Sequence, residues 1–325
     1  MSNQKIYQVC VIGGGSAGTM AALRTVLNND ECLFFPGTPK DKKKSRALWV
    51  RRVENMPAHL EYKRGIEEPN LATIKWIQES DFKDKFFIHK TVGVTALKKT
   101  EDGIFEITTS KDETYYAQYV ILCTGVMDVQ PIINGSIEPI FDYANAQTAD
   151  YCLICDGHHV LNKKTAVIGH TTGAAWVAIM LHERYQVPIT ILTHGKEIEF
   201  SEETQKLVEK YDFDIIKNEI TGLEGKAKGI LSRILLKDHD GLDVDICFVS
   251  LGLIVYNELA KMLGAELDER GFVKANVNGE TSVPNLYVAG DLKANTRKQI
   301  YTAWDHAVSA ANDINQKIRK LRRPT

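Results

Sequence analysis

The sequence lacks a long apolar run and carries little net charge. Its first fifteen residues hold one lysine and a short apolar run broken by three glycines. That run is too short for a signal-peptide core or a membrane span. A formal net charge of -2 over 325 residues also argues against a dedicated nucleic-acid binder. We therefore expect a cytoplasmic protein of about two domains, with neither a membrane nor a nucleic acid as a partner.

Cysteine is scarce, and most of it lies in apolar surroundings. Of six cysteines, Cys10, Cys32, Cys123 and Cys247 fall in or beside strand-like apolar runs, where a thiol is usually an inert core residue. This distribution excludes the disulfide framework of a small secreted domain.

The remaining two cysteines form the one motif, Cys152-Leu-Ile-Cys155, followed by Asp156 and Gly157. Such a pair can close a short disulfide whose thiolate form attacks a disulfide on another protein, with Asp156 in place to donate a proton. Half a zinc site, or two buried cysteines spaced by chance, are the alternatives. His158 and His159 would complete a Cys2His2 set, but they follow Cys155 too closely to be comfortable tetrahedral ligands, and no metal is predicted.

The N-terminal stretch predicts a nucleotide-binding turn. Residues 8–12 read as a buried strand, and Gly13, Gly15 and Gly18 form G-x-G-x-x-G before a helical run over 19–26. Glycines there let the backbone approach a pyrophosphate at the positive end of the helix.

The next strand, 32–35, ends without the acidic residue that commonly holds a ribose. The basic run Lys40–Lys44 follows, with Arg46, Arg51 and Arg52 beyond it. Either this run is a solvated loop, or it is a docking patch for an acidic partner.

Two later stretches strengthen the nucleotide-binding signal. Residues 119–125 read as a strand that ends in Thr124-Gly125, with Pro131 after it, and residues 285–291 as a strand that ends in Gly290-Asp291. Together with the first turn they resemble the FAD signature of flavoprotein disulfide reductases that carry two dinucleotide-binding domains. The Cys-x-x-Cys-Asp-Gly motif, preceded by Val53-Glu54-Asn55 and Pro57, narrows the resemblance to the low-molecular-weight thioredoxin reductases.

That resemblance implies an α/β fold of two Rossmann-like, three-layer ββα domains. The flavin domain, over 1–126 and 247–325, would be split by an inserted NAD(P)-type domain, over 127–246, that carries the cysteine pair. Within the insert, a strand ending at Gly169, a helix over 173–181 and a strand over 188–192 repeat the plan of the flavin domain. Residues 91–116 alternate and turn at Asp102-Gly103 like a β hairpin.

The resemblance also implies the roles of the site residues and a homodimer. Cys155 would face the flavin, Cys152 would exchange with the disulfide of a thioredoxin-like protein, and Asp156 would handle the proton. Asn55 would touch the flavin ring. FAD would be held by thirteen residues: Gly13, Gly15, Ser16, Ala17, Gly18, Asn55, Thr124, Gly125, Gly290, Asp291, Lys298, Gln299 and Ile300.

The insert departs from the family where the nicotinamide coenzyme would bind. The family's glycine-rich turn reads Gly169–Ala174 here, with Thr171 where the pyrophosphate comes close, and its His-Arg-Arg run reads Thr193–Lys196. Losing two charge-assisted bonds weakens binding by about 3–6 kcal/mol. NADPH is then an unlikely donor, and no acidic residue is present to favour NADH.

Three readings of the electron donor remain open. His194 and Lys196 could replace the arginines of an ordinary NADPH enzyme. Otherwise the chain is closest to a branch without a working nicotinamide site, of the ferredoxin-dependent or of the deeply rooted, diflavin-linked type. The donor would then be ferredoxin, which the lysine-rich loop favours, or a second FAD in the vacated space.

The C-terminal flavin edge departs as well. Tyr301 and Trp304 are larger than the residues that the family has after Lys298-Gln299-Ile300. Either they stack against the flavin ring, or they pack under a last helix expected over 307–321.

Overall fold

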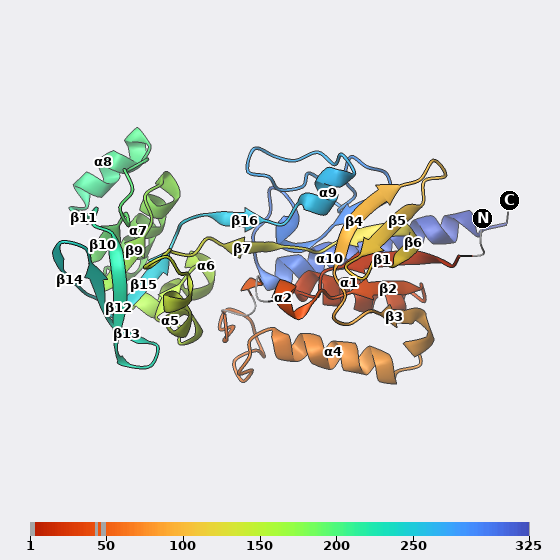
Figure 1. Cartoon of the computed structure of the whole chain (residues 1–325), viewed down its shortest axis with the longest axis horizontal. Coiled ribbons are helices and arrows are strands. Elements are labelled where there is room, and N and C mark those ends of the chain that lie inside the picture. The colour runs from red at the N-terminus through yellow and green to blue at the C-terminus, as the bar shows by residue number, and fades with distance from the viewer. Residues whose placement is uncertain (1–3, 43–44, 47–49, 325) are drawn as a thin grey trace. The chain divides into compact units, whose positions relative to one another are not determined.

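The computed structural model describes residues 4–42, 45–46 and 50–324. These residues divide into two compact units. Unit 1 comprises the described residues up to 46 together with 66–127 and 255–324, and unit 2 comprises 50–65 and 128–254. Figure 1 labels the elements of both units. Among the described residues, none of the helices combines the length and the hydropathy needed to cross a membrane.

Unit 1 is built on a seven-stranded sheet with the order β3-β2-β1-β6-β5-β4, in which β17 also pairs with β6. Strands β1, β2, β3 and β17 run parallel to their neighbours, whereas β4, β5 and the first half of β6 form an antiparallel meander. The strand bounds are β1 Ile6–Ile12, β2 Cys32–Phe35, β3 Phe86–Ile88, β4 Val94–Lys99, β5 Phe105–Thr109, β6 Thr114–Leu122 and β17 Leu286–Val288.

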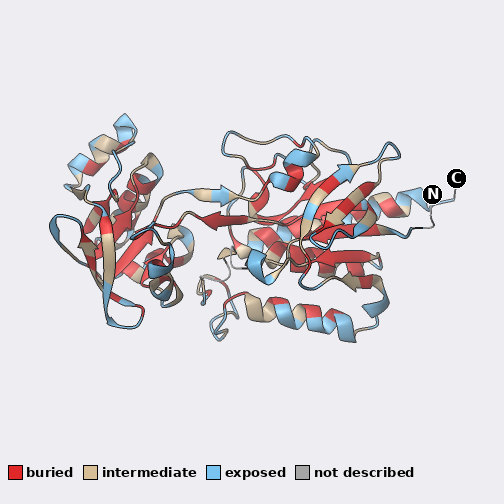
Figure 2. Cartoon of the chain, in the orientation of Figure 1, coloured by how far each residue is buried: buried red, intermediate tan, exposed pale blue. Residues whose placement is uncertain are grey.

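Each face of this sheet has its own apolar core. One core joins the sheet to α1 (Ser16–Leu27), α4 (Glu67–Glu79) and α10 (Ile300–Leu321). The other joins it to the meander and to α9 (Glu258–Met262). Strands β1 and β2 are largely buried, whereas the outer face of α4 is exposed, as Figure 2 shows. The remaining elements are short: α2 Pro39–Lys42, η1 Lys83–Lys85 and η4 Gly290–Leu292.

Unit 2 repeats this plan on a five-stranded parallel sheet with the order β11-β10-β9-β15-β8. Helices α7 (Thr172–Tyr185) and α8 (Glu202–Lys210) share one core with it, and the antiparallel strands β12, β13 and β14 share the other. Its strands are β8 Ala149–Asp150, β9 Thr165–Ile168, β10 Ile189–Leu192, β11 Asp214–Ile216, β12 Ile220–Ala227, β13 Ile230–Leu236, β14 His239–Asp243 and β15 Ile246–Val249. Its short helices are η2 Glu138–Ile140, α5 Phe141–Asn145, α6 Leu153–Asp156 and η3 Gly157–Val160. The predicted α/β fold of two Rossmann-like units is confirmed.

The units differ from the predicted domain ranges at two places. Unit 2 runs to residue 254 because β15 pairs with β9 and β8, so 247–254 belong with the insert. Residues 50–65 also belong to unit 2, where Arg51 Nε donates to Asn145 Oδ1 at 3.0 Å. The connections β7 (Val126–Asp128) and β16 (Leu253–Val255) pair with each other.

Two local predictions need adjustment. The expected hairpin forms as β4 and β5, but its continuation and the expected strand 119–122 are one strand, β6. The last helix begins at Ile300 rather than 307, because buried Ala303 extends the apolar face that continues through Ala307 and Ala310. Lys43 and Lys44 of the lysine-rich loop lie outside the described residues.

Candidate functional site

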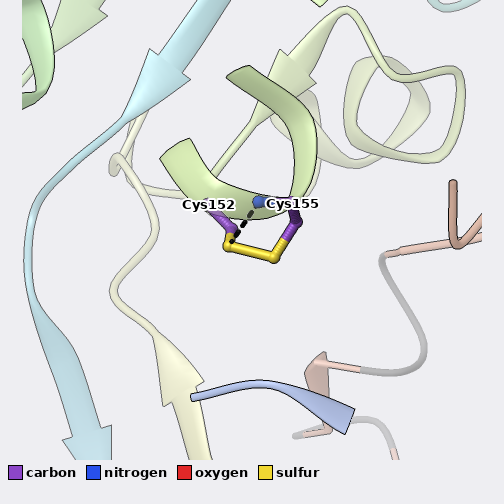
Figure 3. Close-up of a disulfide and its surroundings, with 2 residues drawn as sticks. All are labelled: Cys152 and Cys155. Atoms are coloured by element: carbon purple, nitrogen blue, oxygen red, sulfur yellow. Dashed lines mark hydrogen bonds between the residues drawn. A yellow bond between two sulfur atoms is a disulfide. The ribbon is translucent and has the colours of Figure 1, made fainter. Parts of the chain in front are cut away.

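Cys152 and Cys155 form a disulfide across the single turn of α6 (Figure 3), with an S–S distance of 2.06 Å and Cα atoms 5.2 Å apart. The backbone N–H of Cys155 donates to Cys152 Sγ at 3.1 Å. After reduction the same N–H can stabilise a thiolate on Cys152. Ile154, between the two cysteines, is 54% exposed, so this turn borders solvent.

The other four cysteines are buried and free. Burial raises the pKa of each thiol, and at Cys10 this is reinforced by neighbouring Cys32. A protonated, enclosed thiol is a poor nucleophile. Their prediction as core residues is confirmed, which leaves Cys152 and Cys155 as the candidate reactive cysteines.

A polar cluster follows the disulfide directly in the chain. Glu54 Oε2 lies 2.9 Å from His158 Nε2 and 3.0 Å from His159 Nε2, while His159 Nδ1 lies 2.8 Å from Oδ2 of buried Asp150. Burial disfavours a charged His159, but its bonds to Asp150 and Glu54 outweigh this and raise the pKa of His159 to about 9. Asp156, next to Cys155, is 5% exposed.

Sequence reasoning missed this cluster. Glu54 is 104 residues from His158, and no local pattern links them. The one signal in the sequence was the pair His158-His159 itself. It stands directly after Cys-Asp-Gly, where the resemblance to the thioredoxin reductases leads one to expect aromatic residues.

In unit 1, the carboxyl ends of β1, β6 and β17 bring most of the predicted flavin residues to one edge of the sheet. A Cβ on Gly13 would lie 2.2 Å from the Cys123 carbonyl oxygen, and one on Gly290 would lie 2.8 Å from Ala17 Cβ. There is thus no room for a side chain at Gly13 or Gly290, and glycine allows the turns to lie this close together.

The turn between β1 and α1 fits a dinucleotide. Gly15 is the N-cap of α1 and brings no side chain to the N–H groups of the first turn, which begins with Ser16, Ala17 and Gly18. Among the described residues, no atom beyond its chain neighbours would lie within 4 Å of a Cβ on Gly15, so the space beside this backbone is open. Open space beside the first N–H groups of a helix suits a pyrophosphate.

The other predicted residues lie at the same edge, with one exception. Thr124 Oγ1 donates to the Tyr256 carbonyl at 2.6 Å, Gly125 follows with φ +69°, and Asp291 lies in η4. Gln299 is the N-cap of α10, and Ile300 is its first residue. The exception is Asn55, which belongs to unit 2.

The Lys298 side chain is held beside this edge of the sheet by contacts with Lys293 and Phe272. Its Nζ donates to the Lys293 carbonyl at 2.7 Å and lies 4.0 Å from the centre of the Phe272 ring. Burial lowers the pKa of Lys298 from 10.5 to about 8, against the opposing pull of Asp291.

We expect Lys298 to make stability depend on pH. Its folded-state pKa lies below the unfolded one, so between about pH 8 and about pH 10.5 the unfolded chain binds more protons and stability rises with pH. Relative to Lys298→Met, the wild type should therefore gain unfolding free energy from about pH 7 to about pH 10, measured by urea denaturation. For Lys274→Met, at an exposed lysine, the difference in unfolding free energy from the wild type should stay the same across this pH range. If the difference in unfolding free energy between the wild type and Lys298→Met did not change with pH, the expectation would be contradicted.

In unit 2, the turn after β9 is already occupied by the chain. A Cβ on Gly169 would lie 2.5 Å from both Ala174 Cβ and the Ser250 carbonyl oxygen, so glycine is needed there. Thr171 is the N-cap of α7, and the N–H of Thr172 donates to the Glu199 carbonyl at 3.2 Å. The first amide of α7 is thus paired with protein.

His194, after β10, is also engaged. Its Nδ1 accepts from the backbone N–H of Ile220 at 2.9 Å, and its Nε2 lies 3.0 Å from the Ile132 carbonyl oxygen. An N–H can only donate and a carbonyl can only accept, so the ring is a neutral Nε2–H tautomer. Both ring nitrogens therefore serve the fold.

Comparisons with known proteins place this geometry in a family. The model of the pyridine nucleotide-disulphide oxidoreductases matches residues 7–311. The chain belongs to that family. A thioredoxin reductase of Listeria innocua is 27% identical over 99% of this chain and 97% of its own length. A ferredoxin–NADP reductase 2 of Listeria monocytogenes is 26% identical over 95% and 92%.

The fold agrees with solved members. Thioredoxin reductase from Streptococcus pyogenes superposes with a TM-score of 0.81 at 20% identity, over 97% of this chain and 99% of that one. The chain is thus a thioredoxin-reductase-like flavoprotein disulfide oxidoreductase with a close cysteine pair, and the family implies FAD.

Proposed function

We propose that this enzyme reduces the disulfide of a thioredoxin-like protein with electrons that do not come from NADPH. Bound FAD would supply the electron pair that opens the Cys152–Cys155 disulfide. The residues proposed to hold it are those at the unit 1 edge, with Asn55 from the 50–65 segment at the flavin ring. We further propose that the chain acts as a homodimer.

The chain's own part is thiol–disulfide exchange. Two electrons and two protons convert the pair into two thiols, and buried Asp156 is proposed to pass the proton to sulfur. The Cys152 thiolate, favoured by the Cys155 N–H, attacks the partner's disulfide and forms a mixed disulfide. Cys155 then attacks Cys152 Sγ, which restores the disulfide and releases the partner as a dithiol.

The observation that carries the choice of donor is the state of His194. A neutral ring whose two nitrogens bond to Ile220 and Ile132 cannot replace an arginine at a 2′-phosphate. The Thr172 amide is taken by Glu199, and Glu197 pairs with Lys217 at 3.1 Å.

The alternative is an ordinary NADPH-dependent thioredoxin reductase with a divergent nucleotide site. Exposed Lys196 is the cation that would support it. For the NADPH-independent enzyme, the donor is reduced ferredoxin, docking on the basic run near Lys40, or a second FAD in the space of the coenzyme.

We expect anaerobic NADPH to leave the flavin oxidised. Without the arginine contacts its affinity should fall by about 100- to 10,000-fold, so micromolar NADPH should not bleach the yellow protein, whereas dithionite should. Reduced ferredoxin is then tested as donor, and flavin released per chain is counted. One flavin per chain, together with reduction of that flavin by ferredoxin, would support ferredoxin as the docked donor. Two flavins per chain would support a diflavin enzyme. Rapid bleaching by micromolar NADPH would establish the alternative.

A further inference from the structure

Three side chains in unit 2 point donor atoms at a common position. Glu54 Oε2 lies 2.9 Å from His158 Nε2 and 3.0 Å from His159 Nε2, and the three atoms all lie within 4.8 Å of one another. The two imidazole rings are neighbours, with centroids 4.3 Å apart and planes inclined by 58°. Both rings therefore present the same nitrogen to one carboxylate oxygen.

This arrangement suits a divalent transition metal. Zinc binds imidazole nitrogen and carboxylate oxygen at about 2.0–2.2 Å, and two histidines with one glutamate form a known zinc set that leaves a position for water. Ligand atoms this close together can reach one ion with small movements. We propose that Glu54, His158 and His159 bind one Zn²⁺ beside the redox disulfide.

A second observation comes from Asp150. Its side chain is 5% exposed, and its Oδ2 lies 2.8 Å from His159 Nδ1. Protein ligands to metals commonly donate the far ring N–H to such a carboxylate, which fixes the tautomer and strengthens the ligand. With Nδ1–H given to Asp150, loss of the Nε2 proton on metal binding would leave the Nε2 lone pair of His159 directed at the metal position.

The proposed ligands differ in solvent exposure, and the most exposed of them, His158, gives a metal ion access from solvent. The His158 side chain is 47% exposed, Glu54 29% and His159 11%. Zinc would replace the protons that now bridge the imidazoles to Glu54, so the hydrogen-bonded cluster is the metal-free state of the same site. The ion would tie the 50–65 segment to His158 and His159 of η3, three and four residues after Cys155.

The sulfur atoms are not part of this set. In the oxidised protein Cys152 and Cys155 are joined to each other, and the other four cysteines are buried. This separates the proposal from a Cys2His2 site, because zinc should bind while the disulfide is intact.

The test is calorimetric titration of the oxidised, flavin-bound protein with Zn²⁺. We expect one ion per chain. Asp150→Asn should weaken binding by about 10- to 100-fold, and Glu54→Gln and His158→Ala by at least as much. His239→Ala, at an exposed histidine of the same unit, is the matched control and should bind as the wild type does. Flavin absorbance and near-UV circular dichroism check that each variant is folded.

Cobalt supplies an independent readout. Co²⁺ bound to nitrogen and oxygen should show visible bands without a sulfur-to-cobalt charge-transfer band, and Cys152→Ser/Cys155→Ser should retain the site. The proposal is overturned if the wild type binds no stoichiometric zinc. It is equally overturned if folded Glu54→Gln and His158→Ala keep wild-type affinity, or if binding requires the cysteines. None of these results depends on which electron donor the enzyme uses.

Discussion

Cys152→Ser and Cys155→Ser should each lower the turnover of a protein disulfide by at least about 10⁴-fold while the flavin stays bound. In the proposed mechanism both electrons pass through the Cys152–Cys155 pair, and a serine hydroxyl can neither form a disulfide nor attack one at neutral pH. The measurement is the rate of substrate thiol formation with dithionite-reduced enzyme, together with the visible spectrum of each variant.

The two variants should differ in what they trap. Cys155→Ser keeps Cys152, the thiol proposed to exchange with the substrate, so it should accumulate a mixed disulfide with the substrate, whereas Cys152→Ser should not. Cys247→Ala is the matched control, because this thiol is fully buried in the same unit. It should keep the wild-type rate and lower the free energy of unfolding by about 0.5–3 kcal/mol. Trapping by Cys152→Ser alone would reverse the assigned roles.

Gly18→Ala should unfold unit 1 more easily and release its flavin. The added Cβ would lie 1.7 Å from the Gly13 carbonyl oxygen, which is backbone and cannot rotate away. Such overpacking costs about 1–3 kcal/mol and occasionally more. The measurements are urea unfolding and flavin released per chain.

Gly15→Ala provides the contrast within the same turn. Its backbone lies at φ -76° and ψ -167°, which alanine adopts freely, and no atom of the described residues beyond its chain neighbours would lie within 4 Å of the new methyl. The apoprotein should therefore keep its stability, but the methyl would enter the space proposed for the pyrophosphate. We expect FAD affinity to fall by about tenfold or more. Unchanged FAD affinity would show that the dinucleotide does not lie against Gly15.

Much of the fold could be predicted from local sequence. The buried runs of β1 and β2 and the helix between them followed from apolar pattern and from glycines at fixed positions. The same signals identified β9, α7 and β10. These elements are determined by the periodicity of apolar residues and by the residues that favour turns, and both signals are contained within about a dozen residues.

The rest depends on contacts that local pattern does not contain. The charged, turn-rich strands β12 to β14 gave no clear alternation, and the 50–65 segment has no regular structure. Its place in unit 2 comes from long-range bonds, such as Arg51 to Asn145. Likewise, the sequence showed that His194 stands where an arginine is expected, but only the structure shows both its nitrogens paired.

Unit 2 is built from two stretches that are separated in the sequence, and this affects how its residues can be exchanged between related genes. An exchange between relatives that transferred only residues 128–254 would carry His158 and His159 into a new background and leave position 54 to the recipient. A chimaera made in this way would join the histidines to whatever side chain the recipient has there. Among descendants of this lineage, positions 54, 158 and 159 should therefore vary together, although a hundred residues separate them along the gene.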